Sequence, residues 1–348
     1  MIRPLCRSLS LAAATALALP SLGGAAWARA VLPVHQTVLP DGALRYSVPI
    51  TVGDGAPMEA QLDTGSFGIR VLKSALQPDQ YVATDMHRSY NFGGGAKFDG
   101  VLARAVLGIG PVRGGEPELF QLIESVGCIE GRSQCAASRV KPEDYRIGGD
   151  GYPKEGFPAI FGISMQRATS PDSAQNPLAA DGKSWILTLP RPGDTEPGRL
   201  VVDPDAAERA GFTTLQLKPE DDKSRRLSGW DDADVPACLV QDGGDQRFCG
   251  RALLDSGTAD MVVMTDTVTR FQPWGAGKKA RLEIGGAGGP ASVAFTSGQD
   301  HSSRVILRPP WLGGTQIITG PLPFYSYDVL FDAAAGTIGF KPRPAAAP

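Results

Sequence analysis

The sequence has few histidines and cysteines, and it lacks the motifs of two common hydrolase classes. Among its 348 residues are three His and five Cys. His35, His87 and His301 lie in no ligand-like spacing with the cysteines, which disfavours a zinc site. The motif Gly-x-Ser-x-Gly is absent and no histidine lies near a plausible nucleophile, which disfavours a serine hydrolase. We therefore expect neither a metal nor a cofactor.

Clusters of basic residues are also missing. The formal net charge is −3, and no stripe of Lys and Arg occurs along the chain. Nucleic-acid-binding proteins carry such a stripe or patch, because they must neutralise phosphates. We therefore expect no nucleic-acid partner.

The sequence has no apolar run long enough for a membrane-spanning helix. Two arginines precede the apolar run 9–19, which is shorter than the roughly 20 residues that a span needs. Small-residue cleavage sites follow at Ala28 and Ala30. The pattern predicts a signal peptide, residues 1–30, and export to a periplasm or the medium; a membrane anchor is the alternative. Cys6 precedes the apolar run, which argues against a lipid-modified cysteine at the cleavage site.

Long helical patterns are absent, and turn-forming residues are abundant. The chain contains 43 Gly and 29 Pro, which favour many short strands over long helices. Apolar and polar residues alternate in 45–52 and 101–109, as in half-buried strands. The mixed-charge stretch 218–234 is interpreted as a solvated loop or edge. These features predict many short strands and no long helix.

One short motif occurs twice. Residues 61–66 read Gln-Leu-Asp-Thr-Gly-Ser, and residues 253–258 read Leu-Leu-Asp-Ser-Gly-Thr. Each is an apolar strand that ends at a tight turn, where Gly permits a bend that a Cβ would hinder. Asp63 and Asp255 are 192 positions apart, which suits two similar lobes in one chain. Such lobes would build a pair of facing carboxylates that share a proton.

With its flanking elements, this repeat resembles the pepsin-like aspartic peptidases. A Tyr-containing hairpin, 44–62, leads into the first motif, and apolar segments ending in Gly occur at 157–164 and 317–320. The resemblance covers most of 44–340. It implies an all-β, two-lobed double β-barrel with the active-site cleft between the lobes. The lobes would be residues 31–195 and 196–348.

The resemblance implies a peptidase that uses no covalent intermediate. Asp63 and Asp255 would be catalytic: one carboxylate takes a proton from water while the other hydrogen-bonds the scissile carbonyl. Two facing carboxylates that share a proton are the established arrangement in aspartic proteases. The sequence does not assign which aspartate is ionised. The dyad-supporting residues are Thr64, Gly65, Ser66, Ser256, Gly257 and Thr258. The Ser66 and Thr258 hydroxyls would donate to the outer carboxylate oxygens, and the Thr64 and Ser256 hydroxyls would join the loops.

A Gly-rich hairpin would supply the flap that closes over substrate in this family. Its substrate-binding residues would be Tyr90, Phe92, Gly93 and Gly94. The family's Ser-Asn-Leu-Trp after the first motif is replaced by residues 67–70, Phe-Gly-Ile-Arg, so the Trp that normally supports the flap tyrosine is missing. The basic propeptide of pepsin-like zymogens also has no counterpart. A pepsin-like protein that binds a peptide, glycan or partner enzyme with little or no cleavage is therefore the alternative function.

Four cysteines remain after the signal peptide, which suggests disulfides in an exported protein. Three pairings are possible, and the local one, Cys128–Cys135 and Cys238–Cys249, needs only small loops. The mature chain carries 31 basic and 37 acidic residues, a charge of −6. We expect it to be a monomer without a stable membrane anchor, acting on a protein or peptide substrate.

Overall fold

The computed structural model describes residues 29–168, 170, 172–220, 229–310 and 313–344. The predicted signal peptide lies outside the described residues except for its last two positions. Among the described residues, 25 strands accompany two short α-helices, α1 (Pro177–Ala180) and α2 (Leu322–Ser326). The all-β prediction is confirmed. Single 3₁₀ turns lie at η1 (Lys73–Ala75), η2 (Pro78–Gln80), η3 (Ala136–Arg139), η4 (Pro142–Asp144) and η5 (His301–Ser303).

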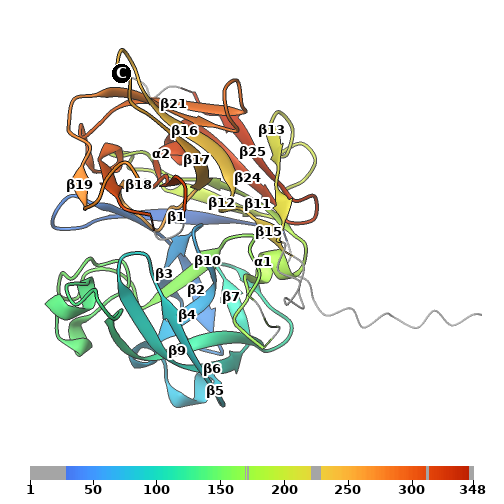
Figure 1. The fold of residues 1–348 in the computed structure, drawn as a ribbon. Helices are drawn as coiled ribbons and strands as arrows, with labels where there is room; N and C mark the ends of the chain where they lie inside the picture. Colours follow the sequence, from blue (N-terminus) through green and yellow to red (C-terminus); the bar gives the residue numbers. More distant parts are fainter. Residues whose placement is uncertain (1–28, 169, 171, 221–228, 311–312, 345–348) are drawn as a thin grey trace, which may run out of the picture.

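The first strand, β1 (Ala30–Val38), joins two lobes that lie one above the other in Figure 1. Its first half pairs with β12 and its second half with β2. A sheet of strands from both ends of the chain continues from β12 in the order β12-β11-β24-β25-β13. A division at residue 195 falls in the loop between β11 and β12, inside this shared sheet. The bounds are β11 (Ser184–Thr188), β12 (Gly198–Val202), β13 (Thr213–Gln216), β24 (Tyr327–Asp332) and β25 (Thr337–Pro342).

The lower lobe in Figure 1 continues from β1 in the order β2-β3-β10-β4-β9-β6-β5. Strand β10 lies between β3 and β4, parallel to β3 and antiparallel to β4. The long strands β5 and β6 form an antiparallel hairpin. The bounds are β2 (Leu44–Val52), β3 (Met58–Asp63), β4 (Phe67–Leu72), β5 (Val82–Asn91), β6 (Ala96–Ala105), β7 (Leu107–Ile109), β8 (Val112–Arg113), β9 (Glu118–Cys128) and β10 (Ala159–Ile163).

The upper lobe repeats this arrangement. Strand β23 lies between β17 and β18, parallel to β17 and antiparallel to β18, as β10 lies between β3 and β4. The full order is β19-β22-β18-β23-β17-β16-β20-β21, and β14 and β15 form a separate two-stranded ladder. The bounds are β14 (Lys218–Pro219), β15 (Trp230–Asp231), β16 (Val235–Gln241), β17 (Arg247–Leu253), β18 (Met261–Met264), β19 (Gln272–Pro273), β20 (Lys279–Ile284), β21 (Ala291–Thr296), β22 (Val305–Arg308) and β23 (Gln316–Ile318).

An apolar core runs through both lobes and the sheet between them. Strand β2 is buried along almost its whole length, with Tyr46, Val48 and Ile50 fully inaccessible. In the shared sheet, the Trp185 and Phe331 rings stack with their centroids 5.6 Å apart. Because the core continues across the shared sheet, it holds the two lobes together and fixes the strand ends that meet between them.

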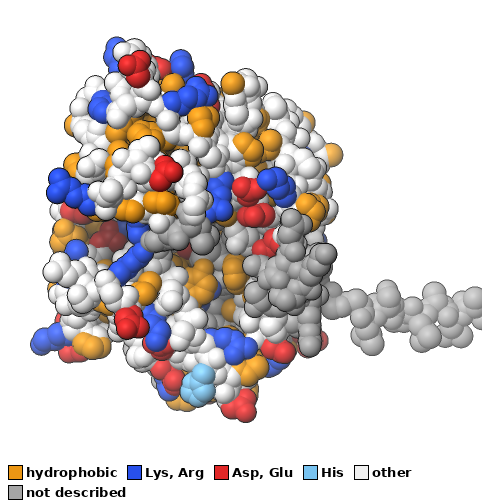
Figure 2. Space-filling model, in the orientation of Figure 1, with side chains coloured by type: hydrophobic (Ala, Val, Ile, Leu, Met, Phe, Trp, Pro, Cys, Tyr) orange, Lys and Arg blue, Asp and Glu red, His pale blue; other side chains and the backbone are white. Residues whose placement is uncertain are grey.

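Both disulfides of the local pairing are present. Cys128 at the end of β9 bonds to Cys135, and Cys238 on β16 bonds to Cys249 opposite it on β17. These bonds indicate an oxidising compartment. No helix among the described residues is long and apolar enough to cross a membrane. Figure 2 shows acidic and basic side chains intermixed over the face that it presents.

Candidate active site

The first aspartate lies where β3 ends between the two lobes. Asp63 is 4% exposed, and two groups of its own turn donate hydrogen bonds to its carboxylate. The Gly65 N–H donates to Oδ1 over 2.8 Å, and the Ser66 hydroxyl donates to Oδ2 over 2.6 Å. Because both oxygens are held, the carboxylate has one fixed orientation.

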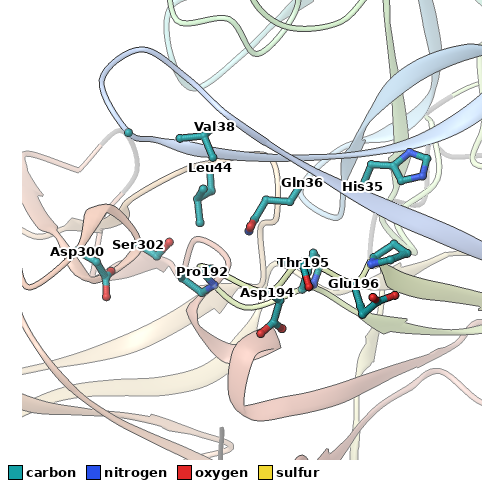
Figure 3. A pocket seen from close by; sticks show the side chains of 14 residues that line it. His35, Gln36, Val38, Leu44, Pro192, Asp194, Thr195, Glu196, Asp300 and Ser302 are labelled. Carbon is teal, nitrogen blue, oxygen red and sulfur yellow. The ribbon is translucent and has the colours of Figure 1, made fainter. Parts of the chain in front are cut away.

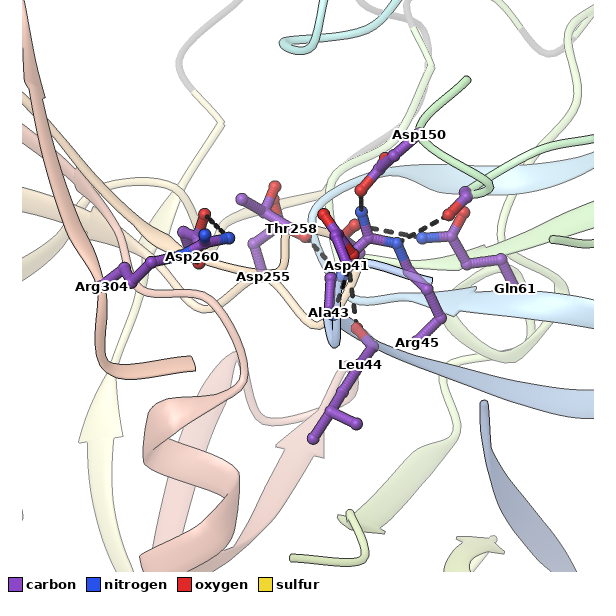
Figure 4. Close-up of polar contacts among 12 residues, drawn as sticks. Asp41, Ala43, Leu44, Arg45, Gln61, Asp150, Asp255, Thr258, Asp260 and Arg304 are labelled. Carbon is purple, nitrogen blue, oxygen red and sulfur yellow. Dashed lines mark hydrogen bonds and ion pairs between the residues drawn. The ribbon is translucent and has the colours of Figure 1, made fainter. Parts of the chain in front are cut away.

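The second aspartate has the same surroundings. Asp255 follows β17, is 8% exposed, and accepts a hydrogen bond from the Gly257 N–H to Oδ1 over 2.8 Å. The Thr258 hydroxyl donates to Oδ2 over 2.6 Å. Figure 4 shows Thr258 beside Asp255. The two lobes therefore present their carboxylates in the same way.

Reciprocal hydrogen bonds join the two loops beneath the carboxylates. The Thr64 hydroxyl donates to the Leu254 carbonyl over 2.6 Å and accepts from the Ser256 N–H over 2.9 Å. The Ser256 hydroxyl donates to the Leu62 carbonyl over 2.8 Å and accepts from the Thr64 N–H over 3.1 Å. All four interactions are buried, so they fix one loop against the other.

The glycines show how closely the two aspartates approach. A Cβ added at Gly65 would lie 2.6 Å from the Asp255 Cγ, and one added at Gly257 would lie 2.6 Å from the Asp63 Oδ1. Each glycine therefore lies against the carboxylate of the opposite lobe. The structure thus brings all eight predicted residues of the two motifs together at one point.

Two close, buried carboxylates cannot both ionise without cost. Burial and then the negative charge of Asp63 raise the pKa of Asp255 well above its ordinary value, while the Thr258 hydroxyl opposes the shift. The two carboxylates therefore titrate together, and the one proton that they share belongs to the pair.

For the peptidase activity that the sequence predicts, we expect Gly65→Ala to lower kcat/KM by about a hundredfold or more, because the added methyl group displaces the Asp255 carboxylate. Gly257→Ala should have the same effect through Asp63. Gly127→Ala is the matched control, since its Cβ would meet nothing within 4 Å. The measurements are steady-state kinetics and thermal unfolding. Full activity of folded Gly65→Ala protein would contradict the close approach of the two loops.

The β5–β6 hairpin contains the predicted flap residues. Its turn is closed by a 2.9 Å hydrogen bond from the Phe92 N–H to the Ala96 carbonyl, and Gly93 and Gly94 are exposed there. Tyr90 and Phe92 pack together with ring centroids 4.7 Å apart. Tyr90 interacts electrostatically with the pair: burial raises the pKa of its hydroxyl, the Arg70 charge opposes this shift, and the charges of Asp63 and Asp255 add to it.

Sequence reasoning missed two buried polar side chains next to the loops. The Gln61 amide donates to the Gly257 carbonyl over 3.1 Å, which is a further link between the lobes. Arg45 donates through Nε to the Gly148 carbonyl over 2.9 Å and pairs with Asp150 (Figure 4). The role of Gln61 could have been suspected, because a glutamine is unusual inside an apolar strand. The role of Arg45 could not, since Arg45 fits the alternation of an ordinary strand.

A cavity of about 670 Å³ lies away from the aspartates. Figure 3 shows it between β1, with Gln36 and Val38, and the loop that carries Pro192 and Asp194. Ser302 also lines it. Within the described part of the chain, no three His, Cys, Asp or Glu side chains cluster as metal ligands would.

Comparison with solved structures identifies the fold. No protein-family model matches the chain, and no curated protein matches its sequence. A crystal structure of the aspartic proteinase from Irpex lacteus matches with a TM-score of 0.55 and 14% identity, over 90% of this chain and 97% of that one. The fold is pepsin-like. The two-lobed, all-β pepsin-like architecture predicted from the sequence is therefore confirmed.

Proposed function

We propose that the protein is an aspartic endopeptidase with Asp63 and Asp255 as its catalytic residues. The observation that supports this most directly is the matching set of hydrogen bonds around the two carboxylates. Each carboxylate is oriented by its own turn, and each turn's glycine lies against the other carboxylate. A pepsin-like fold with both motifs intact adds support.

In the proposed reaction, a water molecule lies between the carboxylates. Asp63 removes a proton from this water as its oxygen bonds to the carbonyl carbon of the scissile peptide. Asp255, protonated at the start, transfers its proton to the carbonyl oxygen, which gives a tetrahedral diol. The C–N bond then breaks as Asp63 returns its proton to the amine nitrogen and a diol hydroxyl returns one to Asp255. At the end of the cycle Asp63 is again ionised and Asp255 is again protonated, and no covalent enzyme intermediate forms.

The test is hydrolysis of an unfolded protein from acid to neutral pH, with mass spectrometry of the products. The proposal predicts cuts at internal peptide bonds and inhibition by a pepstatin-type compound. Products shortened only from their ends would contradict endopeptidase action. Cleavage that resists such an inhibitor would contradict an aspartic mechanism.

The second candidate is a pepsin-like protein that binds a peptide, glycan or partner enzyme and cleaves poorly or not at all. One observation favours it: Phe67 and Arg70 stand in the strand that follows the first motif, where the family usually has Ser and Trp. A folded wild-type protein that binds a pepstatin-type compound but releases no products would support this function. Measuring binding and hydrolysis on one preparation separates the two candidates.

We further propose that the chain is exported and acts as a monomer. The two disulfides support an oxidising compartment. Cleavage of the signal after Ala28 would leave β1 whole, since that strand begins at Ala30. The intact mass of the protein recovered from the periplasm or medium tests export and processing together. A mass that retains residues 1–28 would contradict the cleavage.

A further inference from the structure

A buried arginine lies under the flap hairpin. Arg70 occupies the middle of β4, between Ile160 of β10 and Gln121 of β9, and is only 3% exposed. Its guanidinium lies 3.6 Å from the centroid of the Tyr90 ring and 5.8 Å from that of Phe92. In the sequence, Arg70 was notable only because it departs from the family pattern. In the structure, its side chain lies directly against Tyr90, the predicted flap tyrosine.

The charge of Arg70 has few polar partners. Nη1 donates to the Phe67 carbonyl over 2.8 Å, and the buried Nε has no hydrogen-bond partner. None of the ion pairs among the described residues includes Arg70. Burying a charge is costly, and accordingly burial lowers the pKa of Arg70, while charge interactions with Tyr90 and Asp63 oppose the shift. The face of the Tyr90 ring, 3.6 Å from the guanidinium, adds a cation–π attraction that strengthens as water is excluded.

Tyr90 connects this charge to the catalytic loop. Its ring meets the Phe67 ring edge-on, with centroids 6.4 Å apart. Burial raises the pKa of the Tyr90 hydroxyl, the Arg70 charge lowers it, both aspartates raise it, and a polar interaction with the Ser66 hydroxyl lowers it. Tyr90 and Arg70 therefore both contact Phe67, the residue that follows the motif of Asp63. Ser66, which Tyr90 approaches, itself donates to the Asp63 carboxylate.

We propose that Arg70 is a positioning residue for the flap: its buried guanidinium holds the Tyr90 ring in place and so sets the Tyr90 hydroxyl beside Ser66 and the aspartates. The effect on turnover rests on the proposed peptidase function, whereas the anchoring of the hairpin does not. A planar guanidinium supplies both the charge and a flat face for stacking. Lysine would keep only the charge, and methionine would keep only the apolar length.

The first test is hydrogen–deuterium exchange of the hairpin, which is independent of catalysis. Arg70→Met should speed exchange of the backbone amides of residues 88–97 relative to wild type, and Arg70→Lys should have a smaller effect. Arg104→Met is the matched control, because Arg104 lies exposed on β6 of the same hairpin and should leave exchange unchanged. Hairpin exchange equal to wild type in folded Arg70→Met protein would overturn the proposal.

If Arg70→Met does not fold, substitutions of Tyr90 test the same contact between the Arg70 guanidinium and the Tyr90 ring. Tyr90→Phe keeps the ring face and should leave hairpin exchange unchanged, while Tyr90→Leu removes the ring and should speed it. Equal exchange in these two variants would overturn the proposal. This pair leaves Arg70 itself unaltered, and Tyr90 is only half-buried on its hairpin.

A double-mutant cycle tests the effect on turnover. Arg70→Met and Tyr90→Leu should each lower kcat/KM by about tenfold to a hundredfold, and the double variant should lose no more than Tyr90→Leu alone. Losses that multiply would show that Arg70 acts independently of Tyr90 and would overturn its positioning role. If wild type hydrolyses nothing, the proposed function fails, while the exchange experiment still decides whether Arg70 anchors the hairpin.

Discussion

Asp63→Asn and Asp255→Asn are each expected to lower kcat/KM for a peptide substrate by at least about a hundredfold. The carboxamide keeps the size of the side chain and can still accept hydrogen bonds from its own turn. It cannot take up a proton from water or deliver one to a carbonyl oxygen. The expected loss is therefore in chemistry, with the fold retained. Steady-state kinetics and thermal unfolding of both variants check this.

The controls for this experiment lie next to the pair. Ser66→Ala and Thr258→Ala each remove one donor to a carboxylate but leave both carboxylates present. They should reduce activity much less than the Asn substitutions. If Asp63→Asn is inert while Asp255→Asn keeps wild-type activity, Asp255 has no catalytic role, and the proposed mechanism fails.

The protein is expected to become less stable as the pH rises from about 4 to about 7. The cause is Asp232, a carboxyl that is 2% exposed and lies apart from the catalytic pair. It accepts hydrogen bonds from the Ser164 hydroxyl over 2.8 Å, the Met165 N–H over 2.7 Å and the Gln166 amide over 3.2 Å. Burial raises the pKa of Asp232 to about 7, although these three donors oppose the shift.

The direction of the stability change follows from the raised pKa of Asp232. Between about pH 4 and about pH 7, the folded protein keeps a proton on Asp232 that the unfolded chain has released, so the free energy of unfolding falls as the pH rises. At about 1.4 kcal/mol for each pKa unit, the loss is on the order of a few kcal/mol. Asp255, whose pKa is also raised, contributes in the same direction.

Urea unfolding at several pH values checks this expectation. Asp232→Asn stays neutral throughout, so its stability should decline less steeply between acid and neutral pH than that of wild type. Asp79→Asn is the control, since Asp79 is exposed in the short turn η2. A wild-type stability that rises over this range, or an Asp232→Asn curve as steep as that of wild type, would contradict this account.

Local sequence was enough to predict the parts of the site that depend on local conformation. An aspartate followed by Thr-Gly or Ser-Gly after an apolar strand specifies a turn whose own N–H and hydroxyl groups hold the carboxylate. The repeat of this pattern then implied two lobes. The hydrogen bonds of Thr64 and Ser256 across the interface follow from the same symmetry.

Contacts between distant segments could not be predicted in this way. The stretch 218–234 is interpreted from its charges as solvated, yet the structure buries Asp232 of that stretch against residues 164–166 of the other lobe. That part of the interpretation is wrong, because burial is set by the tertiary neighbours of the segment and not by its composition. Likewise, nothing in the residues around Arg70 shows that the Tyr90 ring lies above it.

The most direct test of the account is kcat/KM for one peptide substrate measured against pH. Two carboxylates that share one proton predict a bell-shaped profile, because activity needs one ionised and one protonated group. Both Asn variants should abolish that profile. A folded wild-type protein that is inert at every pH, or activity that survives Asp255→Asn, would contradict the claim that Asp63 and Asp255 form a catalytic pair.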